Sequence, residues 1–213
     1  MDRAAEIATL GEAARAAFDE KHQAREITIA MSRKAIQACA ASIRATHRGE
    51  FDVAEQLARE ARDRVMRADD ALVGQPDVRT TGPLHDAKKE LAEAWLTLAL
   101  VRDESLPGPD ELQIDIAPYC NGLAEAASEL RRQLLDRLRA GDLARAETLM
   151  GAMDDIYSLL VTIDYPDGVT GGLRRTTDAL RAVLERTRGD LTTAMVAARL
   201  QAAIESAQKA TSG

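Results

Sequence analysis

The chain has 213 residues, a length that favours one domain and suffices for a sizeable hydrophobic core. Hydrophobic residues make up 46% of the chain and aromatic residues only 3%, a composition typical of helical bundles and poor in strand-forming residues. The formal net charge of −7 argues against a nucleic-acid binder held by an overall basic surface, but it leaves open a local basic groove.

The two cysteines and the hydropathy pattern bear on the cellular compartment. Cys39 and Cys120 stand far apart, which excludes a disulfide framework and a cysteine-rich zinc site, and fits a reducing compartment. The N-terminal residues lack the apolar centre of a signal peptide, and no apolar run approaches the roughly 20 residues of a membrane span. We therefore expect a soluble, cytoplasmic protein that does not associate with membranes.

Apolar residues recur at helical spacing along most of the chain and predict an all-α fold, a bundle of about seven helices in a single domain over residues 1–213. The first helix is expected to be very long, over 3–47, with a break or frayed turn near 19–24. Gly49 is placed to follow its C-terminus. Residues 1–20 and 208–213 are expected to be extensions that fray.

The remaining helices follow from caps and chain-breaking residues. Asp142 is expected to cap the fifth helix, and Gly189 with Asp190 to end the sixth helix and begin the seventh. Loops rich in turn-forming residues are expected over 73–83 and 106–110. Helices two to seven are expected over 51–72, 84–101, 118–141, 143–163, 171–188 and 190–207.

Two pairs of glutamates have a spacing that places each pair on one helical face. Glu90 and Glu93 are three residues apart, and Glu125 and Glu129 are four apart. If the two faces meet across a bundle, four carboxylates converge, and such oxygen ligands suit Mg²⁺. With 35 acidic residues in the chain, the spacing alone favours solvated helix faces.

Arginines cluster on three of the expected helices. Arg174 and Arg175 open the sixth helix, Arg131 and Arg132 lie on the fourth, and Arg48 follows the first. The planar guanidinium group pairs well with phosphate oxygens, so these five are candidate nucleic-acid contacts. Intrahelical or intersubunit ion pairs are the alternative. With few aromatic residues to stack on bases, binding is expected to depend on charge and salt.

Three segments resemble the translin family, and in particular its TRAX-like branch. Residues 90–94, ELAEA, are similar to a family pattern E-[aromatic]-x-E-A. Residues 119–132, YCNGLAEAASELRR, are similar to Y-x-x-G-[hydrophobic]-A-D-x-x-G-E-L-x-R. Residues 165–190, YPDGVTGGLRRTTDALRAVLERTRGD, add the turn and basic helix of the same family. The resemblance covers about residues 25–195.

The resemblance implies a fold and an activity. Translin-family proteins are all-helical, bind single-stranded nucleic acid and form closed octameric shells whose acidic sites face an internal cavity. TRAX-like members are metal-dependent endoribonucleases. Their four acidic positions fall on Glu90, Glu93, Glu125 and Glu129, which implies a catalytic and metal-binding role for these residues with Mg²⁺ or Mn²⁺.

The chain departs from the family pattern at a few positions. Glu125 stands where aspartate is usual, Leu91 replaces an aromatic residue and Ser128 replaces a glycine. We expect a homo-oligomer that cleaves single-stranded RNA with Mg²⁺. Two alternatives stay open: an oligomer that binds single-stranded RNA or DNA without catalysis, and a helical scaffold with no nucleic-acid role.

Overall fold

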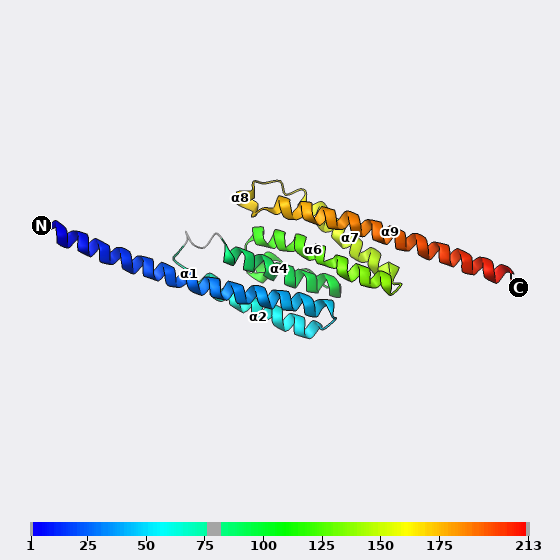
Figure 1. The fold of residues 1–213 in the computed structure, drawn as a ribbon, viewed down its shortest axis with the longest axis horizontal. Helices are drawn as coiled ribbons and strands as arrows, with labels where there is room; N and C mark the ends of the chain where they lie inside the picture. The colour runs from blue at the N-terminus through cyan, green and yellow to red at the C-terminus, as the bar shows by residue number, and fades with distance from the viewer. Residues whose placement is uncertain (1, 76–81, 212–213) are drawn as a thin grey trace.

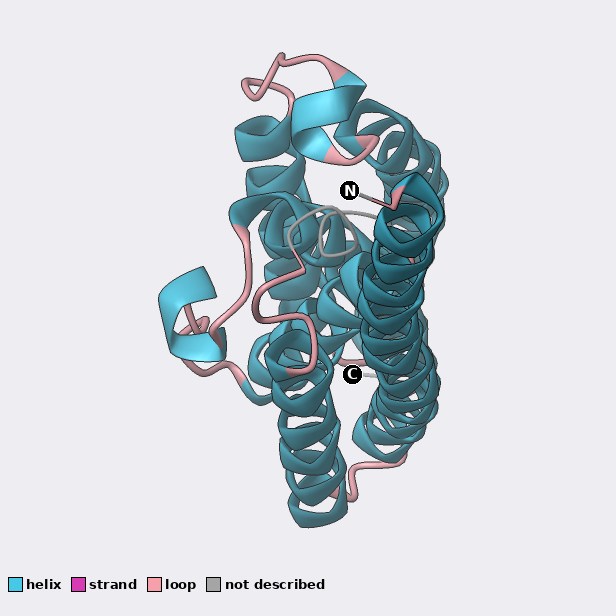
Figure 2. Cartoon of the chain, turned by 90° about the vertical axis from the view of Figure 1, so that its left-hand side faces the viewer, coloured by secondary structure: helices cyan, strands magenta, loops and turns pink. Residues whose placement is uncertain are grey.

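A computed structural model describes residues 2–75 and 82–211, and the secondary structure of these residues is entirely helical. The all-α prediction is confirmed. Figure 2, which looks along the molecule from the end where the chain begins, shows helices and loops only. The helices are α1 (Arg3–His47), α2 (Phe51–Asp70), α4 (Pro83–Arg102), α5 (Pro109–Leu112), α6 (Ile116–Arg139), α7 (Leu143–Leu160), α8 (Asp167–Thr170) and α9 (Leu173–Thr211).

The long helices run side by side as an elongated bundle (Figure 1). Helices α4 and α6 lie in its middle and pack against each other, with α1 and α2 on one side and α7 and α9 on the other. The first half of α1 and the second half of α9 project beyond the bundle at opposite ends. None of the described helices combines the length and hydropathy that crossing a bilayer requires.

Helix α1 is continuous over 45 residues, so the expected break near 19–24 is wrong. This stretch contains no proline or glycine, and its residues extend a helix readily once both flanks are helical. The side chain of Asp2 caps the N-terminus, and Gly49 follows the C-terminus with φ of +76°, as the sequence predicted. Burial in α1 begins at Thr28, so the first turns contribute nothing to the core.

Helix α9 passes through Gly189 and Asp190 without interruption, so the expected end of one helix and start of another at this point is wrong. A buried stripe continues across the glycine, from Leu184 and Thr187 to Leu191. A glycine inside a helix costs about 1 kcal/mol, less than the packing that this stripe provides. The helix extends to Thr211 through most of the segment that was expected to fray.

Smaller differences concern the loops. Asp142 caps α7 by accepting a hydrogen bond from the backbone N–H of Arg145 at 3.1 Å, as expected. Helix α6 begins at Ile116, in agreement with the expected start near residue 118 or somewhat before, and the short helices α5 and α8 lie in segments expected to be irregular. Most of the expected loop over 73–83 lies outside the described residues.

Candidate functional site

Helices α4 and α6 approach each other closely at Gly122. A Cβ atom at this position would lie 2.6 Å from the Cβ of Ala92 and 2.6 Å from the backbone oxygen of Lys89. Any residue larger than glycine would therefore push the two helices apart. This contact holds the glutamates of α4 directly opposite those of α6.

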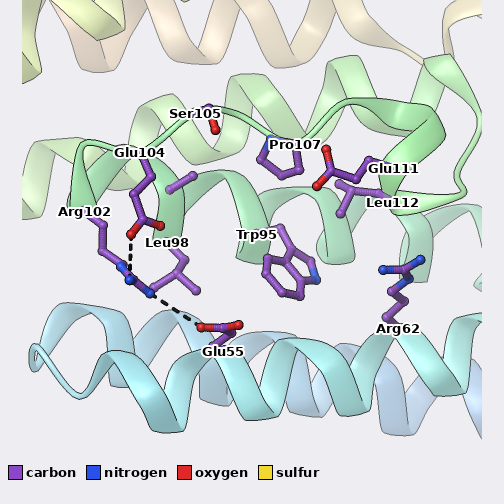
Figure 3. Close-up of a pocket in the computed structure, with 11 residues that line it drawn as sticks. Glu55, Arg62, Trp95, Leu98, Arg102, Glu104, Ser105, Pro107, Glu111 and Leu112 are labelled. Atoms are coloured by element: carbon purple, nitrogen blue, oxygen red, sulfur yellow. Dashed lines mark ion pairs between the residues drawn. The ribbon is translucent and has the colours of Figure 1, made fainter.

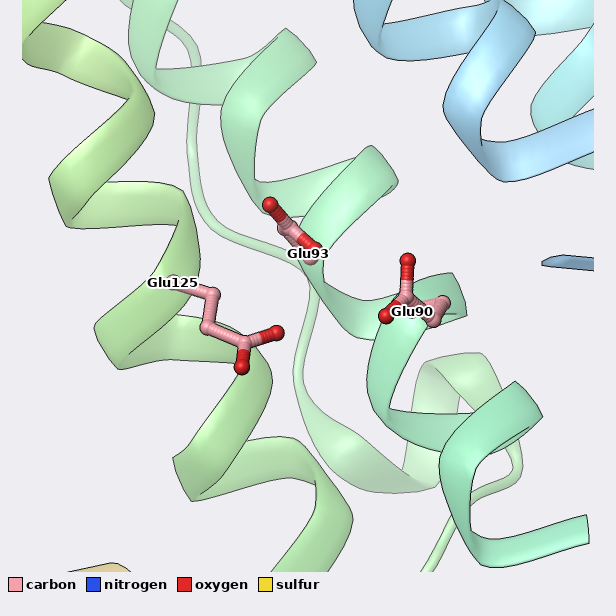
Figure 4. A group of neighbouring side chains, drawn as sticks. All are labelled: Glu90, Glu93 and Glu125. Atoms are coloured by element: carbon pink, nitrogen blue, oxygen red, sulfur yellow. The ribbon is translucent and has the colours of Figure 1, made fainter. Parts of the chain in front are cut away.

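Three of the four predicted glutamates converge between these helices (Figure 4). Glu90, Glu93 and Glu125 each offer one carboxylate oxygen, and the three oxygens lie within 4.8 Å of one another. We call these residues the carboxylate cluster. Glu93 is buried and the other two are half-buried, so the cluster is a partly buried site and not a pair of solvated helix faces.

Glu129, the fourth predicted glutamate, lies outside this triplet and has a partner of its own. Its Oε2 is 2.6 Å from Nε2 of His47, a side chain that is only 3% exposed. The amide nitrogen of Gln133 lies 3.2 Å from Nδ1 of the same imidazole. His47 thus fixes Glu129 at the edge of the cluster, near enough for its charge to act on Glu93. Sequence reasoning did not find this role for His47.

A lysine also enters the site, which sequence reasoning missed. Nζ of Lys89 lies 2.8 Å from Oε1 of Glu125 and 3.5 Å from Oε1 of Glu90. The only signal in the sequence is the position of Lys89 directly before Glu90. At that position a side chain lies at the edge of the glutamate-bearing face and can turn toward α6.

Burial and mutual repulsion govern the charge of the cluster. Burial raises the pKa of Glu93 to about 8, and the negative charges of the three neighbouring glutamates add to this increase. Burial also raises the pKa of Glu90, against the opposing effect of the Lys89 ammonium. Burial lowers the pKa of Lys89, but its hydrogen bond to Glu125 and the nearby carboxylate charges outweigh this effect, so the pKa is raised and the amine stays charged. The site therefore favours an additional positive charge at Glu93, whether a proton or a metal ion.

The donor set fits a hard divalent cation. Carboxylate oxygens are the ligands that Mg²⁺ and Mn²⁺ prefer. Oxygens on opposite sides of an octahedral Mg²⁺ are about 4.2 Å apart, close to the 4.8 Å within which the three cluster oxygens lie. Small torsional changes in half-buried side chains would close the difference. Burial and the charges of Glu90 and Glu93 raise the pKa of the neighbouring Cys39 thiol, so this thiol stays protonated and carries no charge.

Two of the predicted arginines border the site on α6. Arg131 donates to Oγ1 of Thr187 at 3.0 Å and pairs with Asp190 at 2.7 Å, which leaves it partly buried against α9. Arg132 is exposed. Both line a shallow hollow that adjoins Glu129, together with Ser128, Leu135, Asp136 and Arg139.

The other three predicted arginines lie at the end of α1 and at the start of α9. Arg48 is exposed and pairs with Glu50 at 2.9 Å, next to His47. Arg174 and Arg175 are exposed at the start of α9. Their neighbour Thr176 donates to Oδ1 of Asn121, one turn before Glu125 on α6, at 2.7 Å. The structure thus distributes the five arginines around the site without gathering them in one patch.

A second hollow lies on the other side of α4, between α2 and the segment after α4 (Figure 3). Its charged groups pair internally: Arg102 contacts Glu104 at 2.6 Å and Glu55 at 3.5 Å. Trp95 lines this hollow, and its indole N–H makes no hydrogen bond to the described residues. The hollow is lined by arginines as well as glutamates, in contrast to the carboxylate cluster, where three glutamates converge.

Comparisons with known proteins find relatives of this chain and of its fold. Uncharacterized protein MJ0175 of Methanocaldococcus jannaschii is 31% identical to this chain over 175 residues, which cover 81% of this chain and 77% of that protein. The structure of AfC3PO, a translin-family protein, in complex with duplex RNA is 32% identical and superposes with a TM-score of 0.81, covering 87% of this chain and 96% of that one. The chain belongs to the translin family.

Further solved structures support the same translin-type fold. A crystal structure of AfC3PO superposes with a TM-score of 0.80 at 32% identity, covering 87% of this chain and 97% of that one. NeC3PO without ligand superposes with a TM-score of 0.71 at 19% identity, over 88% of this chain and 96% of that one, and shows a shared fold only. No protein-family profile matches the chain. Membership in the translin family confirms the resemblance found in residues 90–94, 119–132 and 165–190.

Proposed function

We propose that this chain is a TRAX-like endoribonuclease of the translin family that cleaves single-stranded RNA with Mg²⁺ or Mn²⁺. The observation that supports this most is the meeting of Glu90, Glu93 and Glu125 across the α4–α6 contact. Scattered exposed glutamates would fit a scaffold, whereas a partly buried cluster in which burial raises the pKa of Glu90 and Glu93 is typical of a site that binds a cation.

The comparison with AfC3PO supports RNA as the substrate class, because that relative has been solved in complex with duplex RNA. In this chain, Arg131 and Arg132 line a hollow beside Glu129, so a phosphate backbone lying there would pass the carboxylate cluster. We expect single-stranded RNA to be the form that the protein cleaves, and duplex RNA is tested in parallel.

Metal binding, proton transfer and phosphate binding would be carried out by different residues of the site. Glu90, Glu93 and Glu125 would hold the metal, which supplies Lewis acidity at a phosphate oxygen and a more acidic bound water. Glu129, which His47 contacts at the edge of the cluster, would accept a proton from the attacking water. Arg131 and Arg132 would hold the phosphates on either side of the cleaved bond.

The protein is proposed to act as a cytoplasmic homo-oligomer, an octamer by family resemblance. Apolar side chains on the projecting parts of α1 and α9 support assembly, because contiguous exposed apolar surface is typical of an interface. They are Ile7, Leu10 and Phe18 on α1, and Val196, Leu200 and Ile204 on α9. Sedimentation analysis tests this part of the proposal, and a monomer at micromolar concentration would contradict it.

Cleavage of labelled RNA tests the enzymatic proposal. Single-stranded RNA is incubated with the protein in Mg²⁺ or in EDTA, and duplex RNA of the same sequence is tested in parallel. We expect cleavage of the single strand in Mg²⁺ only, with a loss on the order of 100-fold in Glu93→Gln. Glu147→Gln is the matched control, because Glu147 is exposed on α7 and its substitution removes the same charge far from the cluster.

Measurements of RNA cleavage and of oligonucleotide binding together distinguish the two alternatives. RNA or DNA binding without any cleavage would favour a non-catalytic binding oligomer. Failure to retain any oligonucleotide at low salt, where charge-driven binding is strongest, would favour a helical scaffold. Cleavage that persists in both EDTA and Glu93→Gln would exclude the carboxylate cluster as the site of the reaction.

A further inference from the structure

We propose that Lys89 is a tethered cation that occupies the carboxylate cluster when no metal is bound and competes with the divalent ion for Glu125. This inference rests on the metal-dependent function proposed above, and it concerns the concentration of divalent ion at which the metal site fills. It concerns a residue that belongs neither to the predicted ligands nor to the predicted nucleic-acid contacts.

The position of Lys89 is that of a counter-ion. Its ammonium bridges the two helices, with Nζ 2.8 Å from Glu125 on α6 and 3.5 Å from Glu90 on its own helix. Glu125 and Glu90 are the two half-buried members of the cluster, and their carboxylates face each other across the gap in Figure 4. Lys89 therefore neutralises part of the charge that a divalent ion would otherwise neutralise.

The two cations cannot share Glu125 at close range. A divalent ion binds a carboxylate oxygen at about 2.1 Å, whereas the ammonium already lies 2.8 Å from Oε1 of the same residue. On one oxygen they would stand less than about 5 Å apart, where like charges repel strongly in a partly buried site. This repulsion favours withdrawal of the ammonium when the ion binds.

The side chain of Lys89 is able to withdraw. It is 23% exposed and ends a flexible four-carbon stem, so rotation of that stem carries the ammonium into solvent. The preceding lysine shows the opposite situation. Lys88 is 5% exposed in its side chain and is held by two carboxylates, Asp69 at 3.0 Å and Asp115 at 2.8 Å. Lys88 is thus a fixed structural ion, whereas Lys89 is an exchangeable one.

The exchange has a consequence for loading. With Lys89 in place, the three glutamates stay gathered without a metal, so the geometry of the site does not depend on the ion. The same ammonium weakens metal binding, because the ion must displace it. The site is therefore expected to fill only when the free divalent ion is abundant.

Direct titration of the intact protein with Mn²⁺, by calorimetry or by the spin-resonance signal of free Mn²⁺, tests this proposal without reference to RNA cleavage. Lys89→Gln removes the competing charge and is expected to bind Mn²⁺ on the order of tenfold more tightly. Lys89→Arg keeps the charge and is expected to bind as the native protein does. Lys34→Gln is the control for net charge, because Lys34 is exposed on α1.

Thermal melting provides a second readout, which also shows that the variants fold. Without metal, Lys89→Gln is expected to melt at a lower temperature than the native protein, because its gathered carboxylates lack a cation. With saturating Mn²⁺, its melting temperature is expected to rise by more than that of the native protein.

The outcomes separate this proposal from the function on which it rests. Equal Mn²⁺ affinity of Lys89→Gln and the native protein, or weaker binding by Lys89→Gln, would overturn the role of Lys89 while leaving a metal site in place. Measurable binding by Lys89→Gln alone would support it. No binding by any variant at millimolar Mn²⁺ would overturn the metal-dependent function, and the proposal for Lys89 with it.

Discussion

Replacing Gly122 with alanine tests whether the close contact of α4 and α6 builds the carboxylate cluster. The added Cβ would lie 2.6 Å from the Cβ of Ala92 and from the backbone oxygen of Lys89, and 2.9 Å from the backbone nitrogen of Glu93. Two of these three atoms belong to the backbone and cannot rotate away. The helices must therefore separate by roughly 1 Å to restore ordinary contact.

The magnitude follows from two opposing effects. Overpacking of this kind costs about 1–3 kcal/mol, while alanine in place of a helical glycine contributes about 1 kcal/mol in the other direction. We expect a net loss of up to about 2 kcal/mol in Gly122→Ala, which for a chain of this length lowers the melting temperature by up to about 8 °C. The separation also moves Glu125 away from Glu93, so Mn²⁺ binding is expected to weaken.

Gly151→Ala is the matched control for this prediction. Gly151 lies inside α7 and is exposed, and a Cβ added there would meet no neighbouring side chain or other helix within 4 Å. The same substitution there should raise the melting temperature by about 2–4 °C through helix propensity alone. Thermal melting and Mn²⁺ titration of both variants give the comparison. Gly122→Ala that melts at or above the native temperature with unchanged Mn²⁺ affinity would refute the reasoning.

Three further predictions concern pH, a buried amide and salt dependence. The pKa of Glu93 is 4.5 in the unfolded chain and about 8 in the folded protein, so the folded state keeps the proton up to a higher pH. Without metal, the free energy of unfolding should therefore fall as the pH rises from 4.5 to 8. Urea denaturation of Glu93→Gln at several pH values should not show this fall. Asn121 donates to the backbone oxygen of Thr170 at 2.8 Å in the core, so Asn121→Ala should cost about 1–3 kcal/mol in the same measurement, and an unchanged midpoint would contradict this. Arg131→Gln should weaken RNA binding and make it less dependent on salt, measured by fluorescence anisotropy at several salt concentrations, whereas an unchanged salt slope would place Arg131 off the phosphate path.

The sequence predicted the features of the fold that depend on neighbouring residues. The end of α1 at Gly49 and the cap of α7 at Asp142 were found because each depends on a few consecutive residues. The shared face of Glu90 and Glu93 followed from helical periodicity. The prediction that a helix ends at Gly189 was wrong for the same reason. The local preference of glycine favours the end of a helix, but the buried stripe of α9 outweighs that preference.

The remaining parts of the site depend on contacts between distant segments. His47 and Glu129 are separated by 82 residues, and no pattern in either helix indicates that the imidazole would hold this carboxylate. The entry of Lys89 into the cluster depends on where α6 lies relative to α4, which a single helix does not reveal. The grouping of Glu125 with the two glutamates of α4 came from the family resemblance and not from spacing, because acidic pairs are common in this chain.

The contact at Gly122 also bears on how freely the rest of the protein can vary. The spacing of α4 and α6 is fixed there by main-chain atoms and a single methyl group, not by large interlocking side chains. Substitutions on the outward faces of α2 and α7 can therefore accumulate while the distance between the clustered carboxylates stays the same. The tolerance of the surface to substitution thus depends on a glycine in the interior.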